Sequence, residues 1–169
     1  MAVALPQPPK RDLVIIHHTA DRSAGLQLAK VDAYHKTRDF PQSSLGYFVG
    51  YHYFIEKTGQ VTQTRKETEI GAHVRGYNER GLGIGLAGDF SAELPTSAQM
   101  DALKNLIDTI FAETPARYVD IVFHRELAAT DCPGKLFTDR YLIYEFLKRT
   151  VNIISKFTLI WQLVLRKLR

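Results

Sequence analysis

A histidine and the only cysteine of the chain, His124 and Cys132, lie eight positions apart in a turn-rich segment that ends at Gly134. An imidazole and a thiolate are two of the ligands that Zn²⁺ prefers. With a third protein ligand, the fourth position of the ion is left for water, which is the catalytic rather than the structural arrangement. His17 is the candidate for this third ligand. The alternative is that Cys132 is a small buried hydrophobe, a common role for a lone cysteine.

Hydrophobic periodicity predicts the elements that must bring these side chains together. The first helix should turn Leu28, Val31 and Tyr34 inward, and Thr96 with Gln99 fits a capping box. The order of the elements implies an α/β domain with a single mixed β-sheet flanked by helices. Strands are predicted at residues 13–16, 48–55, 60–64, 82–87 and 118–123, and helices at 26–37, 96–113 and 138–149.

Both candidate histidines stand at the ends of predicted strands. His17 closes the first strand and His124 closes the last one. If these two strands are neighbours, both imidazoles reach one edge of the sheet, and the loop to Cys132 can swing back over them. The glycines of residues 82–87 suggest a backbone that another group approaches closely from one side.

Length and composition indicate one ordinary globular domain. The chain has 169 residues, 45% hydrophobic and 24% charged, and its single cysteine excludes an internal disulfide. Residues 1–147 carry a net charge of −2 and residues 148–169 carry +6, so no nucleic-acid partner is expected for the body of the chain. Residues 1–11 are a proline-rich lead that lacks the apolar run of a secretory signal. We therefore expect synthesis in the cytoplasm, with release or export by a route that this sequence does not encode.

Five short blocks resemble, in order and at about the right spacing, the type 2 zinc-dependent N-acetylmuramoyl-L-alanine amidases. They are HHTA from residue 17, GYHYF from residue 50, GAHVRGYN from residue 71, GIGLAG from residue 83, and the segment from His124 to TDCPG. The family includes small phage lysozymes of amidase type and animal peptidoglycan recognition proteins. The resemblance covers roughly residues 12–149. It implies hydrolysis of the amide bond between N-acetylmuramic acid and L-alanine in peptidoglycan.

The resemblance also implies roles for single residues. By position, His17, His124 and Cys132 match the zinc ligands of the family, and Zn²⁺ is the expected cofactor. Tyr51 matches the catalytic tyrosine, which can position the attacking water or stabilise the oxyanion. Thr130 falls where relatives carry a lysine or a threonine beside the metal, and it is the second predicted catalytic residue.

Four further residues match positions that line the substrate groove: His18, Thr19, His73 and Asn78. Alternatives from the residues themselves stay open for three of them. His18 can be an ordinary strand-end histidine, His73 a solvent-exposed loop residue, and Asn78 the cap of a turn. His35, in the first helix, lies away from every block and is interpreted as structural.

The last twenty residues, 150–169, lie beyond the resemblance and carry basic residues and an apolar stripe at helical spacing. They are predicted to form a C-terminal amphipathic helix that follows a catalytic domain of residues 12–149. Two interpretations are open: packing on the domain or on a second copy, and binding to an anionic membrane or envelope surface. A spanning helix is not favoured, because the apolar stretch is short and contains Lys156 and Gln162.

The expected function is that of a cell-wall lytic amidase, endolysin-like or bacterial, with peptidoglycan as its partner. The main rival is a recognition module that binds muropeptides without cutting them. Non-cutting relatives typically lack the cysteine ligand, so the presence of Cys132 favours the enzyme. A protein-binding effector that uses the same surface would leave no signature in these residues.

Overall fold

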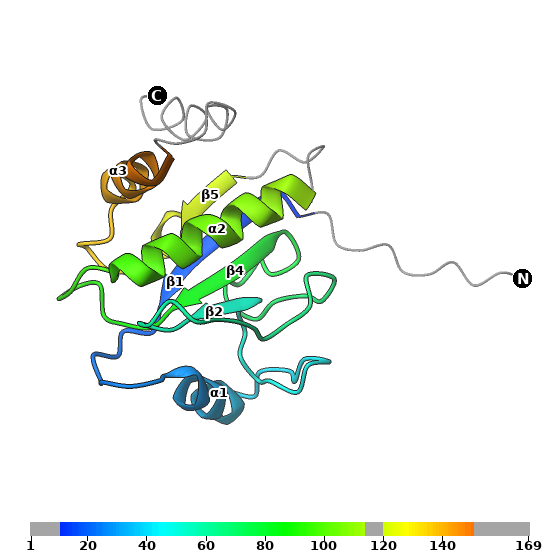
Figure 1. The fold of residues 1–169 in the computed structure, drawn as a ribbon. Helices are drawn as coiled ribbons and strands as arrows, with labels where there is room; N and C mark the ends of the chain where they lie inside the picture. The colour runs from blue at the N-terminus through cyan, green and yellow to red at the C-terminus, as the bar shows by residue number, and fades with distance from the viewer. Residues whose placement is uncertain (1–10, 114–119, 151–169) are drawn as a thin grey trace, which may run out of the picture.

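A computed structural model describes residues 11–113 and 120–150 of the chain (Figure 1). The strands are β1 (Leu13–His18), β2 (Tyr53–Ile55), β3 (Val61–Gln63), β4 (Gly81–Leu86) and β5 (Asp120–Phe123), and the α-helices are α1 (Leu28–Thr37), α2 (Ser97–Glu113) and α3 (Asp139–Thr150). The five strands form one mixed sheet in the order β3-β2-β4-β1-β5. β1 is parallel to both β4 and β5, β2 is parallel to β4, and β3 is antiparallel to β2. The predicted α/β fold with a single mixed sheet is confirmed.

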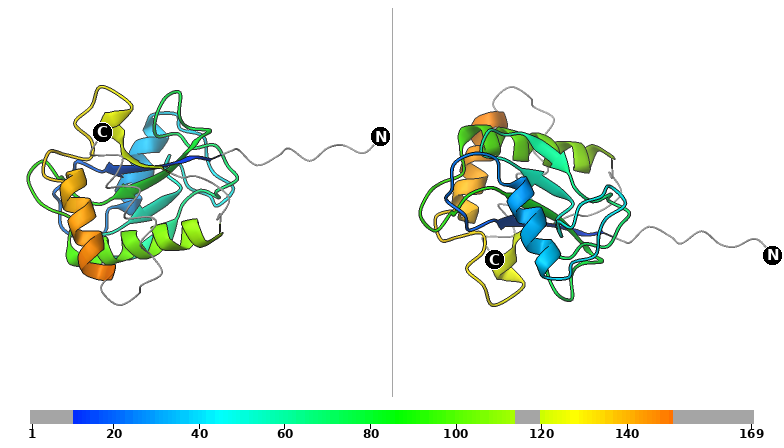
Figure 2. Two further views of the ribbon diagram at one scale, coloured as in Figure 1. Left: turned by 90° about the horizontal axis from the view of Figure 1, so that it is seen from above. Right: turned by 90° about the horizontal axis from the view of Figure 1, so that it is seen from below.

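One face of the sheet is covered by α2 and α3, and α1 lies on the opposite side (Figures 1 and 2). The capping box predicted at the start of α2 is present, because Thr96 and Gln99 exchange backbone-to-side-chain hydrogen bonds of 3.1 Å. The main core fills the space between this face and the two helices. Among its buried members are Ile16, Ile84, Met100, Leu103, Ile107, Phe123 and Phe146.

The second strand begins later than predicted, at Tyr53 rather than at residue 48. The backbone N–H groups of residues 48–50 are bonded to side chains of α1 instead of to a neighbouring strand, whereas the N–H of His52 already bonds to the carbonyl of Gly83 in β4. Asp32 Oδ1 accepts hydrogen bonds from the N–H of Phe48, at 2.6 Å, and from that of the next residue. His35 Nδ1 accepts one from the N–H of Gly50, at 3.1 Å. These polar contacts replace the sheet ladder and fix the segment that leads to β2.

The inward face of α1 also differs from the prediction. Tyr34 is 60% exposed, whereas Leu28 and Val31 are only half-buried. The buried residue of this helix is His35, whose ring stacks on Phe40 with centroids 4.6 Å apart. The prediction for Tyr34 was wrong because α1 packs on an irregular segment through polar and aromatic contacts, and not on the sheet through an aliphatic stripe.

Two predictions fall outside the described residues. The predicted C-terminal amphipathic helix lies there from residue 151 onward, and so does the proline-rich lead as far as residue 10. The domain boundaries drawn from these segments therefore stay predictions. Within residues 11–113 and 120–150, none of the helices is long and apolar enough to cross a bilayer.

Candidate metal centre

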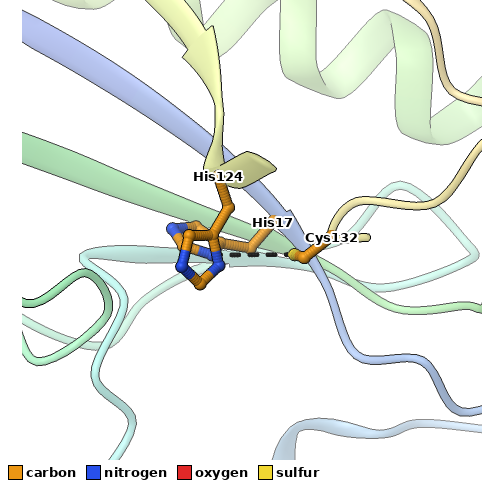
Figure 3. Close-up of side chains that lie close together, drawn as sticks. All are labelled: His17, His124 and Cys132. Carbon is orange, nitrogen blue, oxygen red and sulfur yellow. Dashed lines mark hydrogen bonds between the residues drawn. The ribbon is translucent and has the colours of Figure 1, made fainter. Parts of the chain in front are cut away.

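The ends of β1 and β5 position the two candidate histidine ligands. These strands are adjacent and parallel, with Ile16 paired to Phe123, so the two strands that carry the histidines are neighbours as the prediction required. Ile16 and Phe123 both belong to the main core. Because successive side chains of a strand face opposite sides of the sheet, His17 and His124 follow on the side away from α2 (Figure 3).

The loop after β5 brings Cys132 to the same place. Its carbonyl oxygen accepts a hydrogen bond of 2.9 Å from the N–H of Arg125, and the Arg125 guanidinium donates to the carbonyl of Gly134 at 2.8 Å. The sulfur of Cys132 accepts the backbone N–H of His18 at 3.4 Å. One arginine and one strand-end amide therefore close the loop and aim the thiol at the end of β1.

His17, His124 and Cys132 converge so that one ligand atom from each lies within 4.8 Å of the others. His17 Nδ1 is 3.8 Å from Cys132 Sγ, the contact drawn in Figure 3. A nitrogen and a sulfur bound to one tetrahedral Zn²⁺ would stand about 3.6 Å apart, given the usual bond lengths. The spacing of His17 and Cys132 thus fits zinc, and the three residue types match its ligand preference.

The protonation states of the donors suit a cation. Burial lowers the pKa of His17 well below its usual value, and the neighbouring His73 and His124 lower it further. Burial also lowers the pKa of His124. Both imidazoles are therefore neutral near pH 7 and keep a lone pair for a metal. Burial raises the pKa of the Cys132 thiol to about 11, so a bound metal must displace its proton.

Tyr51 lies beside this cluster. Its ring centroid is 4.9 Å from that of His17 and 5.4 Å from that of His35. Burial raises the pKa of the Tyr51 phenol above its usual value, so the hydroxyl stays protonated at neutral pH and can donate a hydrogen bond. Thr130 is exposed on the loop before Cys132, and its hydroxyl accepts the Cys132 N–H at 3.3 Å.

Glycines of β4 make room for the aromatic rings on this face. Gly85 pairs with His17 in the parallel ladder, and a Cβ added to Gly85 would come within 2.4 Å of the Tyr51 ring. A Cβ at Gly83 would come within 2.8 Å of the ring of His73. The close approach predicted from the glycines of residues 82–87 is therefore confirmed, and the approaching groups are these two rings.

Substituting Gly85 by alanine is expected to displace the Tyr51 ring and to lower the free energy of unfolding by about 1–3 kcal/mol, the usual effect of overpacking. Chemical denaturation would measure this loss. The matched control is the same substitution in a Tyr51→Ala background, where the clashing ring is absent and the loss should shrink. An equal loss in both backgrounds would show that the ring contact is not its cause.

The two predicted groove residues at the end of β1, His18 and Thr19, form hydrogen bonds with other residues of the protein. His18 Nδ1 accepts the N–H of Phe90 at 3.1 Å. The Thr19 hydroxyl donates to the side-chain oxygen of Gln27 at 2.7 Å and accepts the N–H of Gly88 at 2.9 Å. These bonds tie β1 to the segment after β4, and contact of either residue with a substrate stays a prediction.

The other two predicted groove residues form one unit. Asn78 Oδ1 accepts the N–H groups of His73 and Val74, each at 2.8 Å, so Asn78 caps a turn as its alternative interpretation had it. His73 is not a solvent-exposed loop residue. Its ring nitrogens contact His17 and the carbonyl of Gly81, which leaves substrate contact as an untested prediction for both residues.

Comparison with known proteins shows the family of this chain. The model of the N-acetylmuramoyl-L-alanine amidase family, Amidase_2, matches residues 6–135. The chain is 34% identical over 132 residues to peptidoglycan-recognition protein 2 of Holotrichia diomphalia, covering 73% of this chain and 67% of that protein. It is 29% identical over 139 residues to the endolysin of Escherichia phage T7, covering 78% of this chain and 86% of the endolysin.

A solved structure agrees with these matches. The N-acetylmuramoyl-L-alanine amidase LysC from Clostridium intestinale URNW superposes with a TM-score of 0.67 at 29% identity, covering 90% of this chain and 94% of LysC. The chain thus belongs to the Amidase_2 family, which joins amidases to peptidoglycan-recognition proteins. It spans about two thirds of the length of the insect relatives that it matches.

Proposed function

We propose that this protein is a zinc-dependent N-acetylmuramoyl-L-alanine amidase, which hydrolyses the amide bond between N-acetylmuramic acid and L-alanine in peptidoglycan. The observation that carries the proposal is the convergence of His17, His124 and Cys132 beside the ring of Tyr51, whose hydroxyl stays protonated. Two neutral imidazoles and one thiolate suit a catalytic zinc, whose remaining position is open to water.

The residues of the chain divide the work of this reaction. A bound Zn²⁺ would polarise the scissile carbonyl and bring the pKa of water toward about 7. Tyr51 donates a hydrogen bond to the negative charge that develops on the carbonyl oxygen, because its raised pKa keeps the proton in place. Thr130, exposed at the rim of the cluster, orients the substrate or donates to the same charge.

A recognition module is the second candidate function, and the names of the peptidoglycan-recognition relatives favour it. Such a module would bind the same muramyl peptide without cutting it. Cys132 argues for the enzyme, because a protein that only binds peptide has no need of a third metal ligand whose thiol must lose a proton.

The two functions are distinguished by incubating the zinc-loaded chain with purified peptidoglycan and measuring newly exposed N-terminal alanine. An amidase releases one alanine amine for every bond cut. Removing the metal with a chelator should abolish this release, and restoring zinc should recover it. Retention of the protein on peptidoglycan without any release of alanine would reject the enzyme in favour of the recognition module.

A further inference from the structure

The ring of His73 forms a link between His17 and the backbone of β4. Its Nδ1 is 3.1 Å from Nε2 of His17, and its own Nε2 is 3.3 Å from the carbonyl oxygen of Gly81. The two imidazoles meet edge to face, with centroids 5.0 Å apart. His73 therefore contacts Nε2 of His17, whereas Cys132 lies near the other ring nitrogen, Nδ1.

The end of this link determines where its protons lie. The carbonyl oxygen of Gly81 can only accept, so the proton of His73 must be on Nε2. A buried neutral imidazole has one donor and one acceptor, which leaves Nδ1 of His73 as the acceptor. Nε2 of His17 must then donate. The lone pair of His17 consequently lies on Nδ1, the nitrogen that is 3.8 Å from Cys132 Sγ.

The surroundings of His73 hold its ring in this orientation. Asn78 fixes the backbone by accepting the N–H of His73 at 2.8 Å. The ring lies against Gly83, where any side chain would collide with it. His52 borders it edge to face at 5.8 Å, and is itself fixed, because its Nδ1 accepts the N–H of Gly83 at 3.0 Å.

We infer that His73 is a positioning residue, which selects the tautomer and the orientation of His17 that present Nδ1 to a metal shared with His124 and Cys132. The inference deepens the proposed function, since it concerns the same metal site. It gives His73 a role through His17, in place of direct contact with the substrate. Partners of this kind on a metal-bound histidine typically change metal affinity by about 10–100-fold.

Two variants separate the hydrogen bond from the space that the ring fills. His73→Phe keeps a flat ring beside Gly83 but removes both nitrogens. His73→Asn places a carboxamide oxygen close to the position of Nδ1, so it can still accept from His17. Circular dichroism and thermal melting identify folded variants before any other measurement.

The first measurement uses the metal-free protein and no substrate. Nitrogen-15 NMR of the histidine side chains reports which nitrogen of His17 carries the proton. We expect Nε2–H in the wild type and in His73→Asn, and a mixture of tautomers in His73→Phe. A wild-type His17 protonated on Nδ1 would overturn the inference, even if neither variant folds.

The second measurement is the affinity for zinc, from competition with a chromophoric chelator. His73→Phe should bind zinc about 10–100-fold more weakly than wild type, and His73→Asn should recover most of the loss. Equal affinity of wild type and folded His73→Phe would contradict the inference. Neither measurement involves peptidoglycan, so failure of the proposed amidase activity would be seen separately from failure of this inference.

Discussion

Replacing Cys132 by serine is expected to lower peptidoglycan hydrolysis by about a thousandfold or more and to remove most of the bound zinc. A serine hydroxyl stays protonated at neutral pH and is a poor ligand for zinc. His17 and His124 alone would then hold the ion weakly. Losing several kcal/mol of metal assistance corresponds to a rate effect of this size, since about 1.4 kcal/mol changes a rate tenfold. Zinc content by elemental analysis and the release of alanine amines measure the two effects.

The matched control for this variant is Asp131→Ser, an exposed position next to Cys132 on the same loop. The Asp131→Ser variant should keep both zinc and activity. No metal ligand is changed in it, and the hydrogen bond from the Arg125 N–H to the Cys132 carbonyl is retained. If Cys132→Ser keeps one zinc per chain and wild-type activity, the cysteine is not a ligand and the metal mechanism is wrong.

Removing only the hydroxyl of Tyr51, by substitution with phenylalanine, is expected to lower kcat by about a hundredfold or more. The ring would still fill the space over Gly85, so the fold and the zinc site should be unchanged. The loss falls on kcat rather than on KM, because the hydrogen bond is made to charge that appears only in the transition state. Steady-state kinetics together with zinc content measure both parts of this prediction.

Tyr34→Phe is the control for Tyr51→Phe. Tyr34 is 60% exposed on α1, so losing its hydroxyl should leave kcat and KM at wild-type values. A near-normal kcat for Tyr51→Phe would remove Tyr51 from the mechanism. Loss of zinc from this variant would assign its effect to the metal site instead of to stabilisation of the oxyanion.

The cluster of possible ligands was predictable from sequence because strand ends and residue types determine most of it. A β-branched run stops at His17 and another strand stops at His124, and parallel neighbouring strands bring such ends to one edge of a sheet. The glycines at alternate positions of β4 also predicted that something lies close on one side. They could not identify the rings of Tyr51 and His73, since those come from segments without regular periodicity.

The parts of the fold that were predicted wrongly depend on contacts that an irregular segment makes with a helix. Residues 48–50 have the composition of a strand, yet their N–H groups bond to Asp32 and His35. The periodicity of α1 predicted Leu28, Val31 and Tyr34 on the inward face, and it gave no indication of that pairing. The groove position predicted for His73 stays untested, but its hydrogen bonds to His17 and Gly81 were not predicted, because they depend on how the loop folds back over β4.

One of the three candidate donors, His17, comes from a distant part of the chain, and it is separated from Cys132 by 115 positions. In an unfolded chain His17 and Cys132 are far apart, so a metal ion can be bound tightly only after β1 has docked between β4 and β5. An ion that binds the native form alone adds to stability, by about 4 kcal/mol at a free concentration a thousand times its dissociation constant. The supply of zinc would therefore govern how long the protein survives heat or proteases, apart from any part the metal has in cutting a bond.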